Sequence, residues 1–153
     1  MPNLVELIEQ NAAVNLEDIK DVPPIPVGNY LAQIVGNYEM TQSSRKQTDG
    51  TQFTLRLLQP RDDVDRASLD AYLTAANVNL ADVTLRHTIW DSPYALPQLR
   101  DFLRAAGCEG ELKYALSNIP GKQLVVTITH RIADSNDGTK RLMAQIGGVA
   151  RAS

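Results

Sequence analysis

Residues 52–59 alternate between apolar and polar side chains, and this pattern constrains the fold more than any other feature of the chain. Phe53, Leu55 and Leu57 fall on one side of the segment, and Arg56 falls on the other with its polar neighbours. Because side chains two residues apart share one face of a strand, the pattern is typical of a strand with one buried and one solvated face. We therefore predict a strand here, ended by Pro60.

Four further segments have the composition of strands. Residues 29–40 carry apolar side chains on both faces, and Gly36 within them indicates a bulge or a sharp bend. Residues 83–90 alternate, and 123–131 and 141–149 are rich in β-branched or alternating residues. The chain therefore contains five predicted strands.

Helical spacing appears between the predicted strands. Residues 61–78 combine an acidic loop with a short helix that Ser68 is expected to cap. Residues 91–107, between the third and fourth strands, place apolar side chains at helical spacing and end with Gly107. A shorter helical stretch follows at 111–118. The segment 91–107 is the clearest helix in the sequence.

The predicted order is strand, strand, insertion, strand, helix, strand, strand, which is the order of the OB barrel. We therefore expect a chain that is mainly β with short helices: a five-stranded OB-fold barrel with a helix between strands 3 and 4 and long hairpin loops. This domain would span residues 27–153. An N-terminal arm and a proline-rich lead-in would occupy residues 1–26, because closely spaced prolines forbid a helix there.

The acidity of the chain belongs to the arm. Residues 1–22 carry five acidic residues against Lys20, which is −4, whereas residues 23–153 carry 14 basic against 13 acidic residues, which is +1. Leu4, Leu7 and Ile8 lie on one side of a possible helix in this arm. Two interpretations stay open: the arm packs on its own domain, or it mediates self-association as a homo-oligomer or docking to a partner.

An OB-fold ligand lies across strands 2 and 3, between the loops that join strands 1 to 2 and 4 to 5. Here these loops are residues 40–52, with Asp49-Gly50 as a turn signal, and residues 131–141. Both loops are long and basic, and we expect their tips to converge at one rim of the barrel. The candidate phosphate-binding cations are Arg45 and Lys46 in the first loop and Arg131, Lys140 and Arg141 in the second.

Recognition of a single strand requires cations for the phosphates and flat rings on which bases stack. Strand 2 supplies Arg56, and strand 3 supplies Arg86 and Trp90 in the same outward register. Tyr38, just before the first loop, is a second candidate ring. For both rings the alternative is a position in the core of the barrel.

The segments PPIPVGNYLAQIVGNYE, FTLRLL, LRDFLRAAG and IPGKQLVVTITHR, with the polar finger after the first, resemble the small OB-fold single-stranded-DNA-binding proteins of tailed bacteriophages. The resemblance covers about residues 24–149. It implies sequence-tolerant binding of single-stranded DNA in phage DNA replication or recombination, in the host cytoplasm. The chain ends in GGVARAS instead of an acidic tip, so recruitment of replication partners by such a tail is not implied.

No pattern indicates an enzyme, a metal site or a cofactor. Phosphate-loop, dinucleotide-binding and Gly-x-Ser-x-Gly patterns are missing, and His87 and His130 have no second ligand at metal spacing. The single Cys108 cannot form an internal disulfide, and no apolar run approaches about 18 residues. We therefore expect a cytoplasmic, non-enzymatic protein with no membrane span. The alternative function is a protein-interaction or virion-assembly module built on the same barrel.

Overall fold

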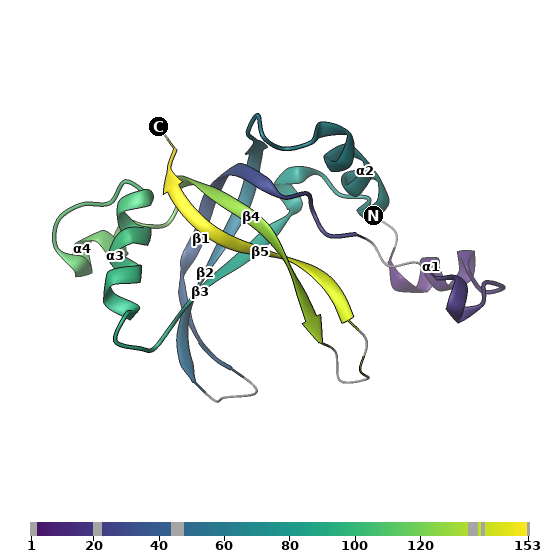
Figure 1. Ribbon diagram of the computed structural model, residues 1–153, viewed down its shortest axis with the longest axis horizontal. Helices are drawn as coiled ribbons and strands as arrows, with labels where there is room; N and C mark the ends of the chain where they lie inside the picture. Colours follow the sequence, from purple (N-terminus) through teal and green to yellow (C-terminus); the bar gives the residue numbers. More distant parts are fainter. Residues whose placement is uncertain (1–2, 20–22, 44–47, 135–137, 139, 153) are drawn as a thin grey trace.

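The computed structural model describes residues 3–19, 23–43, 48–134, 138 and 140–152. Its body is one antiparallel sheet of five strands in the order β3-β2-β1-β4-β5 (Figure 1). The strands are β1 (Gly28–Gln42), β2 (Asp49–Pro60), β3 (Thr84–Trp90), β4 (Gln123–Asp134) and β5 (Lys140–Arg151). The helices are α1 (Leu4–Gln10), α2 (Arg66–Ala76), α3 (Ala95–Ala105) and α4 (Leu112–Ser117), with 3-10 turns η1 (Leu16–Asp18) and η2 (Leu80–Asp82). The predicted mainly β chain with short helices is confirmed.

The sheet curls until its two outer strands approach each other. β1 lies at the centre and pairs with β2 on one edge and β4 on the other, while β3 and β5 form the two ends of the order. Cα atoms of β3 and β5 nevertheless come within 8 Å, and α3 contacts both strands. In the described part of the chain, no hydrogen-bonded ladder joins these two strands. The sheet is therefore consistent with an OB-like fold, but the expected five-stranded barrel is not closed by hydrogen bonds between β3 and β5 in the described residues.

The buried core lies on the inward face of the three central strands, and the predicted alternation of β2 is confirmed there. Its fully buried strand residues are Tyr30, Ala32 and Ile34 of β1, Phe53, Leu55 and Leu57 of β2, and Leu124, Val126 and Ile128 of β4. Each large side chain of this kind contributes about 1.5–3 kcal/mol when fully buried. The inward face of β1, β2 and β4 is therefore a major source of stability.

Helix α3 packs onto the core through Phe102. The Phe102 ring lies 4.6 Å from the ring of Phe53 and 5.0 Å from that of His87, measured between centroids. The planes of His87 and Phe102 are 19° apart, so these two rings are stacked. His87, paired with Phe53 in the ladder, therefore lies on the inward side of β3, in contact with the helix that covers the core. The helix ends before Gly107, whose φ of +80° suits glycine.

A bulge divides β1 into two parts. The pairing of β1 with β2 shifts between Val35 and Glu39, and Gly36 within the shift has a φ of +70°. Glycine adopts this conformation without the steric cost that a side chain adds. The predicted bulge is confirmed. Beyond it β1 and β2 stay paired, and β3 accompanies β2 as far as Gly50, the partner of Trp90.

The acidic loop before α2 holds the start of β1 through hydrogen bonds. The Asp63 carboxylate accepts hydrogen bonds from the backbone N–H of Asn29 at 3.0 Å and from its side-chain amide at 2.9 Å. Helix α2 begins at Arg66, with Asp65 at the N-cap position, so the prediction that Ser68 caps this helix is wrong. Ser68 lies in the first turn, and its hydroxyl donates to the Asp65 carboxylate.

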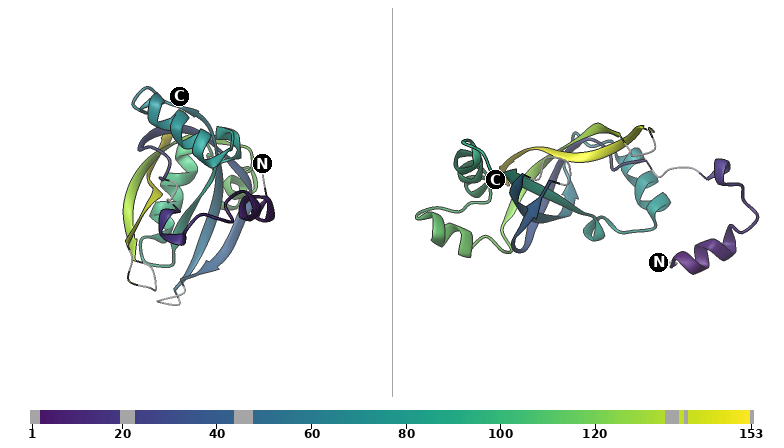
Figure 2. Two further views of the ribbon diagram at one scale, coloured as in Figure 1. Left: turned by 90° about the vertical axis from the view of Figure 1, so that its right-hand side faces the viewer. Right: turned by 90° about the horizontal axis from the view of Figure 1, so that it is seen from below.

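The arm, residues 3–19, stands away from the body (Figures 1 and 2). Every described residue of the arm is exposed, so the structure does not show it packing on its own domain. The lead-in behind it is anchored, because Ile25 is only 2% exposed and the Tyr30 hydroxyl donates to the Pro26 carbonyl at 2.8 Å. The His130 ring also lies within hydrogen-bonding distance of the Ile25 carbonyl, at 2.7 Å.

Candidate nucleic-acid interface

The outward side of β2 and β3 brings together three of the predicted site residues. We call this surface the β2–β3 outer face. It consists of Gly50, Gln52, Thr54 and Arg56 of β2, paired in order with Trp90, Thr88, Arg86 and Thr84 of β3. Arg56 and Arg86 are diagonal neighbours in this ladder, a relation that places Cα atoms about 7–8 Å apart. Arg56, Arg86 and Trp90 are all exposed, so two cations and one ring share a single solvated surface.

Trp90 is not a core residue, because 41% of it is exposed. Its indole lies against the backbone of β2 at Gly50, the residue paired with it in the ladder. A Cβ at Gly50 would lie 2.7 Å from Cε3 of the indole, which is closer than atoms in contact allow. Glycine therefore makes room for the ring to lie on the sheet at the end of β3.

Asp49-Gly50 does not form the predicted hairpin turn. Asp49 pairs with Gln42 at the start of β2, and its carbonyl accepts a hydrogen bond of 2.9 Å from the backbone N–H of Asp91. The β1–β2 ladder therefore continues well into the predicted loop of residues 40–52. The glycine serves the contact with Trp90 instead of a turn.

Tyr38 lies on the other side of the sheet from Trp90. Its ring centroid is 6.1 Å from that of Phe53, which points into the core, and 44% of Tyr38 is exposed. The residue is thus neither fully buried nor part of the β2–β3 outer face. The structure places it at the inward rim, beside the bulge of β1.

The second predicted loop is shorter than expected. β4 extends to Asp134 and β5 begins at Lys140, so Arg131, Lys140 and Arg141 lie on strands and not in a loop of residues 131–141. Arg131 pairs with Met143 and Arg141 with Ala133, which places both arginines on the outward face of this hairpin. Lys140, opposite Asp134, lies on the inward face. All three cations are exposed, but they do not share one surface.

The described ends of the two hairpins extend toward the same end of the molecule (Figures 1 and 2). We call residues 36–43 with 48–52 the β1–β2 ribbon, and residues 129–134 with 140–145 the β4–β5 ribbon. The first is closed at its described end by the backbone hydrogen bond from Ser43 to the Thr48 carbonyl, at 2.9 Å. Arg45 and Lys46 lie outside the described residues. The common direction of the ribbons agrees with the expected placement at one rim.

Among the described residues, the groups with clearly shifted pKa values are Tyr30 and Cys108, which are buried, and His87, which is half-buried on the inward side of β3. Burial raises the pKa of Tyr30 to about 12, with a smaller contribution from the charge of Asp63. Burial also lowers the pKa of His87 and raises that of Cys108. The described residues hold no group of three or more His, Cys, Asp or Glu side chains placed to bind a metal ion. Their longest helices have 11 residues, too few to cross a bilayer.

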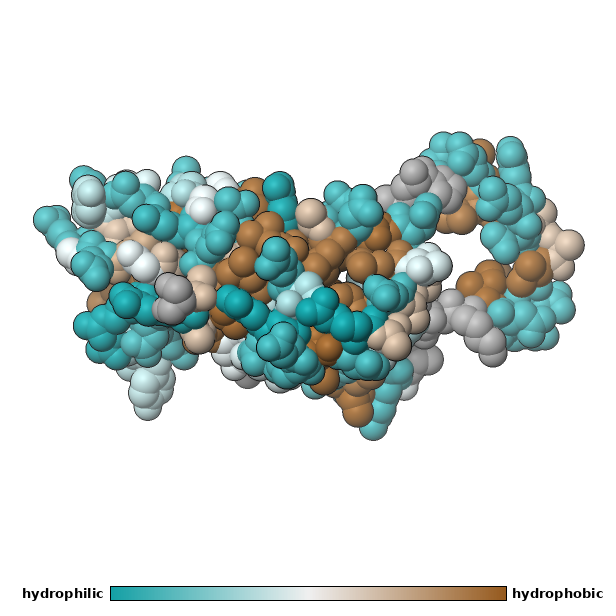
Figure 3. Space-filling model, turned by 90° about the horizontal axis from the view of Figure 1, so that it is seen from above, coloured by the Kyte–Doolittle hydropathy of each residue, from teal (hydrophilic) through white to brown (hydrophobic). Residues whose placement is uncertain are grey.

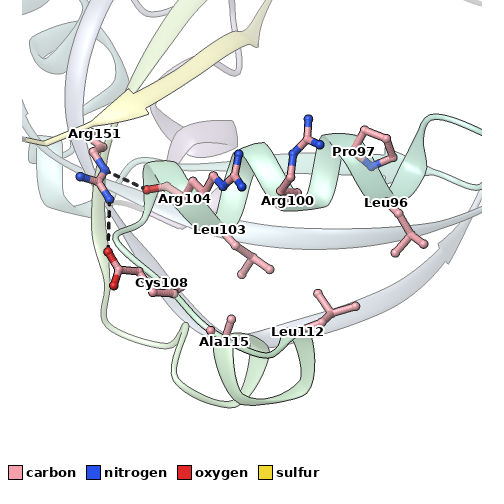
Figure 4. Close-up of a pocket in the computed structure, with 11 residues that line it drawn as sticks. Leu96, Pro97, Arg100, Leu103, Arg104, Cys108, Leu112, Ala115 and Arg151 are labelled. Carbon is pink, nitrogen blue, oxygen red and sulfur yellow. Dashed lines mark hydrogen bonds and ion pairs between the residues drawn. The ribbon is translucent and has the colours of Figure 1, made fainter.

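A pocket of about 730 Å³ lies between α3 and α4, and no sequence pattern predicted it. We call it the α3–α4 groove. In Figure 4, Leu96 and Leu103 of α3 point toward Leu112 and Ala115 of α4 across this space. The remaining lining residues are Pro97, Arg100, Arg104, Cys108, Glu109, Gly110 and Arg151. The groove has no local signature, because its lining comes from two helices, their connection and the end of β5.

No protein-family model matches the chain, and the search of curated proteins found no match. Among solved structures, the chain shows a distant likeness to yeast RPA bound to ssDNA. The sequence identity is 12%, the alignment covers 95% of this chain and 86% of that chain, and the TM-score is 0.29. A TM-score this low carries no argument about fold or function, so a function for this chain has to be inferred from its own geometry.

Proposed function

We propose that this chain binds single-stranded DNA, with little sequence preference, on the β2–β3 outer face. The observation that carries the proposal is the exposed Trp90 indole seated on Gly50, in the same outward register as Arg86 and near Arg56. An aromatic platform can stack on any base, because every base has a flat face. Cations beside the platform attract phosphates of any sequence.

The same arrangement sets the strength of the proposed binding. One base stacked on Trp90 would contribute about 1–3 kcal/mol, as aromatic stacking does in other single-strand binders. Each phosphate neutralised by an arginine such as Arg56 or Arg86 would add about 0.7 to the slope of affinity against salt concentration. Since the face supplies only two arginines, we expect moderate affinity with a shallow salt dependence. Cations of the ribbons that also contact phosphates would increase both the affinity and the salt dependence.

We further propose that the chain acts as a binding protein and not as an enzyme, in the DNA replication or recombination of a bacteriophage. Its role would be to hold unwound strands extended and to shield them from nucleases. Arg45 and Lys46, and the ribbon residues Arg131 and Arg141, would guide the strand toward the β2–β3 outer face. Lys140, on the inward face of its ribbon, is less well placed to do so.

A second candidate function is a protein-interaction or virion-assembly module. It is favoured by apolar side chains exposed on the ribbons: Met40 is 73%, Ile132 67% and Leu142 49% exposed. Exposed apolar side chains that lie close together often mark a protein contact. In this alternative the ribbons would bind another protein through these side chains, and the β2–β3 outer face would bind no nucleic acid.

Titration with oligo(dT) distinguishes the two functions. Trp90 is the single tryptophan of the chain, so its fluorescence reports directly on the proposed platform. We expect quenching on addition of oligo(dT), weaker at each higher salt concentration. The absence of both quenching and a gel shift at low salt would refute DNA binding and support the interaction module.

An arginine substitution tests the surface itself. Arg86→Ala should weaken binding and reduce the salt slope by about 0.7, because one phosphate contact is lost. Lys113→Ala is the matched control, since it removes the same charge from an exposed site on α4, outside the β2–β3 outer face. Equal effects of the two substitutions would show that overall charge, and not this face, governs binding.

A further inference from the structure

Helix α1 is an amphipathic helix with no partner in the described structure. Leu4, Val5, Leu7 and Ile8 share one side of it at helical spacing and are 71%, 62%, 42% and 58% exposed. Asn3 caps the helix, because its side chain accepts a hydrogen bond of 2.9 Å from the backbone N–H of Glu6. In Figure 3 the arm projects from the domain, and hydrophobic residues are visible on its surface beside hydrophilic ones. A capped helix with one exposed apolar side is suited to dock in an apolar groove of another surface.

The α3–α4 groove has the complementary surface. Its aliphatic lining is open to solvent, since Leu96 is 65% and Leu112 44% exposed. Three arginines and one glutamate line it. Arg100 is paired with Asp101 at 3.1 Å and Arg151 with Glu109 at 3.9 Å, so Arg104 supplies the excess positive charge of the groove. Arg104 makes no side-chain hydrogen bond or ion pair with another described residue, so its charge is available to a partner.

We propose that α1 of one copy of this chain binds in the α3–α4 groove of a second copy. The apolar side of α1 would cover the leucines of the groove. The acidic residues of the arm, four among residues 3–19 with no Lys or Arg among them, would lie near the arginines at its edge. Apolar and ionic complementarity thus select the same pair of surfaces. This inference does not depend on DNA binding.

The placement of the two surfaces favours a second copy over the chain's own groove. The arm leaves the body on the side of α2, and α3 and α4 lie on the opposite side (Figure 1). The lead-in is held at Ile25 and Pro26 by the contacts of Tyr30 and His130, and its prolines keep it extended and directed outward. Reaching the chain's own groove would require the arm to turn back across the body, whereas reaching a neighbour's groove requires no such change.

The contact would be heterologous, because different surfaces meet on the two copies. A contact of this kind joins copies head to tail and does not close unless the rotation between them forms a ring. If the proposed function is also correct, such a row of copies would place successive β2–β3 outer faces along one DNA strand.

Sedimentation velocity of the full chain, without DNA, tests the proposal. We expect the weight-average sedimentation coefficient to rise with protein concentration at low salt. Leu4→Ser with Ile8→Ser should abolish the rise, and so should Leu96→Asp with Arg104→Glu in the groove. All four residues are exposed, so the domain is expected to fold in both variants. Lys113→Glu reverses the charge of an exposed residue of α4 that does not line the groove, so it is the charge control and should leave association unchanged.

Mixing the two variants gives the sharpest test. The arm variant keeps an intact groove and the groove variant keeps an intact arm, so an equimolar mixture should form a one-to-one dimer that grows no further. A wild-type chain that stays monomeric at all concentrations would overturn the proposal, whether its arm is free or bound to its own groove. Association that is lost in the arm variant but kept in the groove variant would also overturn it, because the arms would then pair with each other.

Discussion

His87 should make the folded chain less stable in mild acid. Its ring is stacked on Phe102 beneath α3, and burial lowers its pKa below the ordinary value of 6.5. Between the lowered pKa and 6.5, the unfolded chain binds a proton at this residue and the folded chain does not. Above pH 6.5 His87 is neutral in both states and destabilises neither. As the pH falls from 6.5 toward the lowered pKa, protonation of His87 in the unfolded chain lowers the free energy of unfolding.

The size of this effect has an upper bound. A single proton changes the free energy of unfolding by at most about 1.4 kcal/mol for each pH unit. Urea unfolding of the wild type and of His87→Phe, measured from about pH 5.5 to 7.5 where most carboxylates stay ionised, isolates the contribution of this residue. As the pH falls, the free energy of unfolding should decrease more for the wild type than for His87→Phe. Parallel pH profiles would refute the reasoning, since His87 would then titrate alike in both states.

Two further substitutions test the junction between the lead-in, β1 and the loop before α2. Gly28→Ala should reduce stability by about 1–3 kcal/mol, since its φ of +136° disfavours a side chain and the new Cβ would lie 2.7 Å from Cγ2 of Val64; an unchanged urea midpoint would contradict this. Tyr30→Phe should cost about 1 kcal/mol because the Pro26 carbonyl loses its donor, and it should remove the tyrosine that titrates near 12 in a spectroscopic pH titration. Equal stability of the two proteins would show that water replaces the hydroxyl.

Local patterns predicted much of the fold correctly. The alternation of Phe53, Leu55 and Leu57 identified the inward face of β2, because burial on one face leaves a period of two in the sequence. Gly36 identified the bulge and Gly107 the end of α3, since both positions have a positive φ that suits glycine. The outward register of Arg86 and Trp90 followed from the same alternation on β3.

The misplaced boundaries have a common physical cause. The ends of the ribbons, at Gln42 with Asp49 and at Asp134 with Lys140, pair through the backbone while their polar side chains remain in water. Polar composition therefore suggested loops where strands continue. The role of Gly50 depends on Trp90, 40 residues away in the sequence, and no local pattern contains that contact.

The two surfaces proposed to join copies of the chain depend on tertiary structure. The spacing of apolar residues in the arm predicts an amphipathic helix but does not say what covers it, so both interpretations stayed open. The α3–α4 groove forms only when two helices and the end of β5 come together. Such a site becomes visible only when the fold is known.

The bulge at Gly36 has a consequence for how such a chain can diversify. Among the described residues, no fully buried core residue lies between Ile34 and Phe53 or after Ile128, and the β5 residues that pack against the core, Ala144, Ile146 and Val149, lie away from the outer end of β5 at Lys140. Substitutions and insertions at the outer ends of the ribbons therefore leave the core packing intact. What these two projections contact can change over evolutionary time while the domain that carries them keeps its stability.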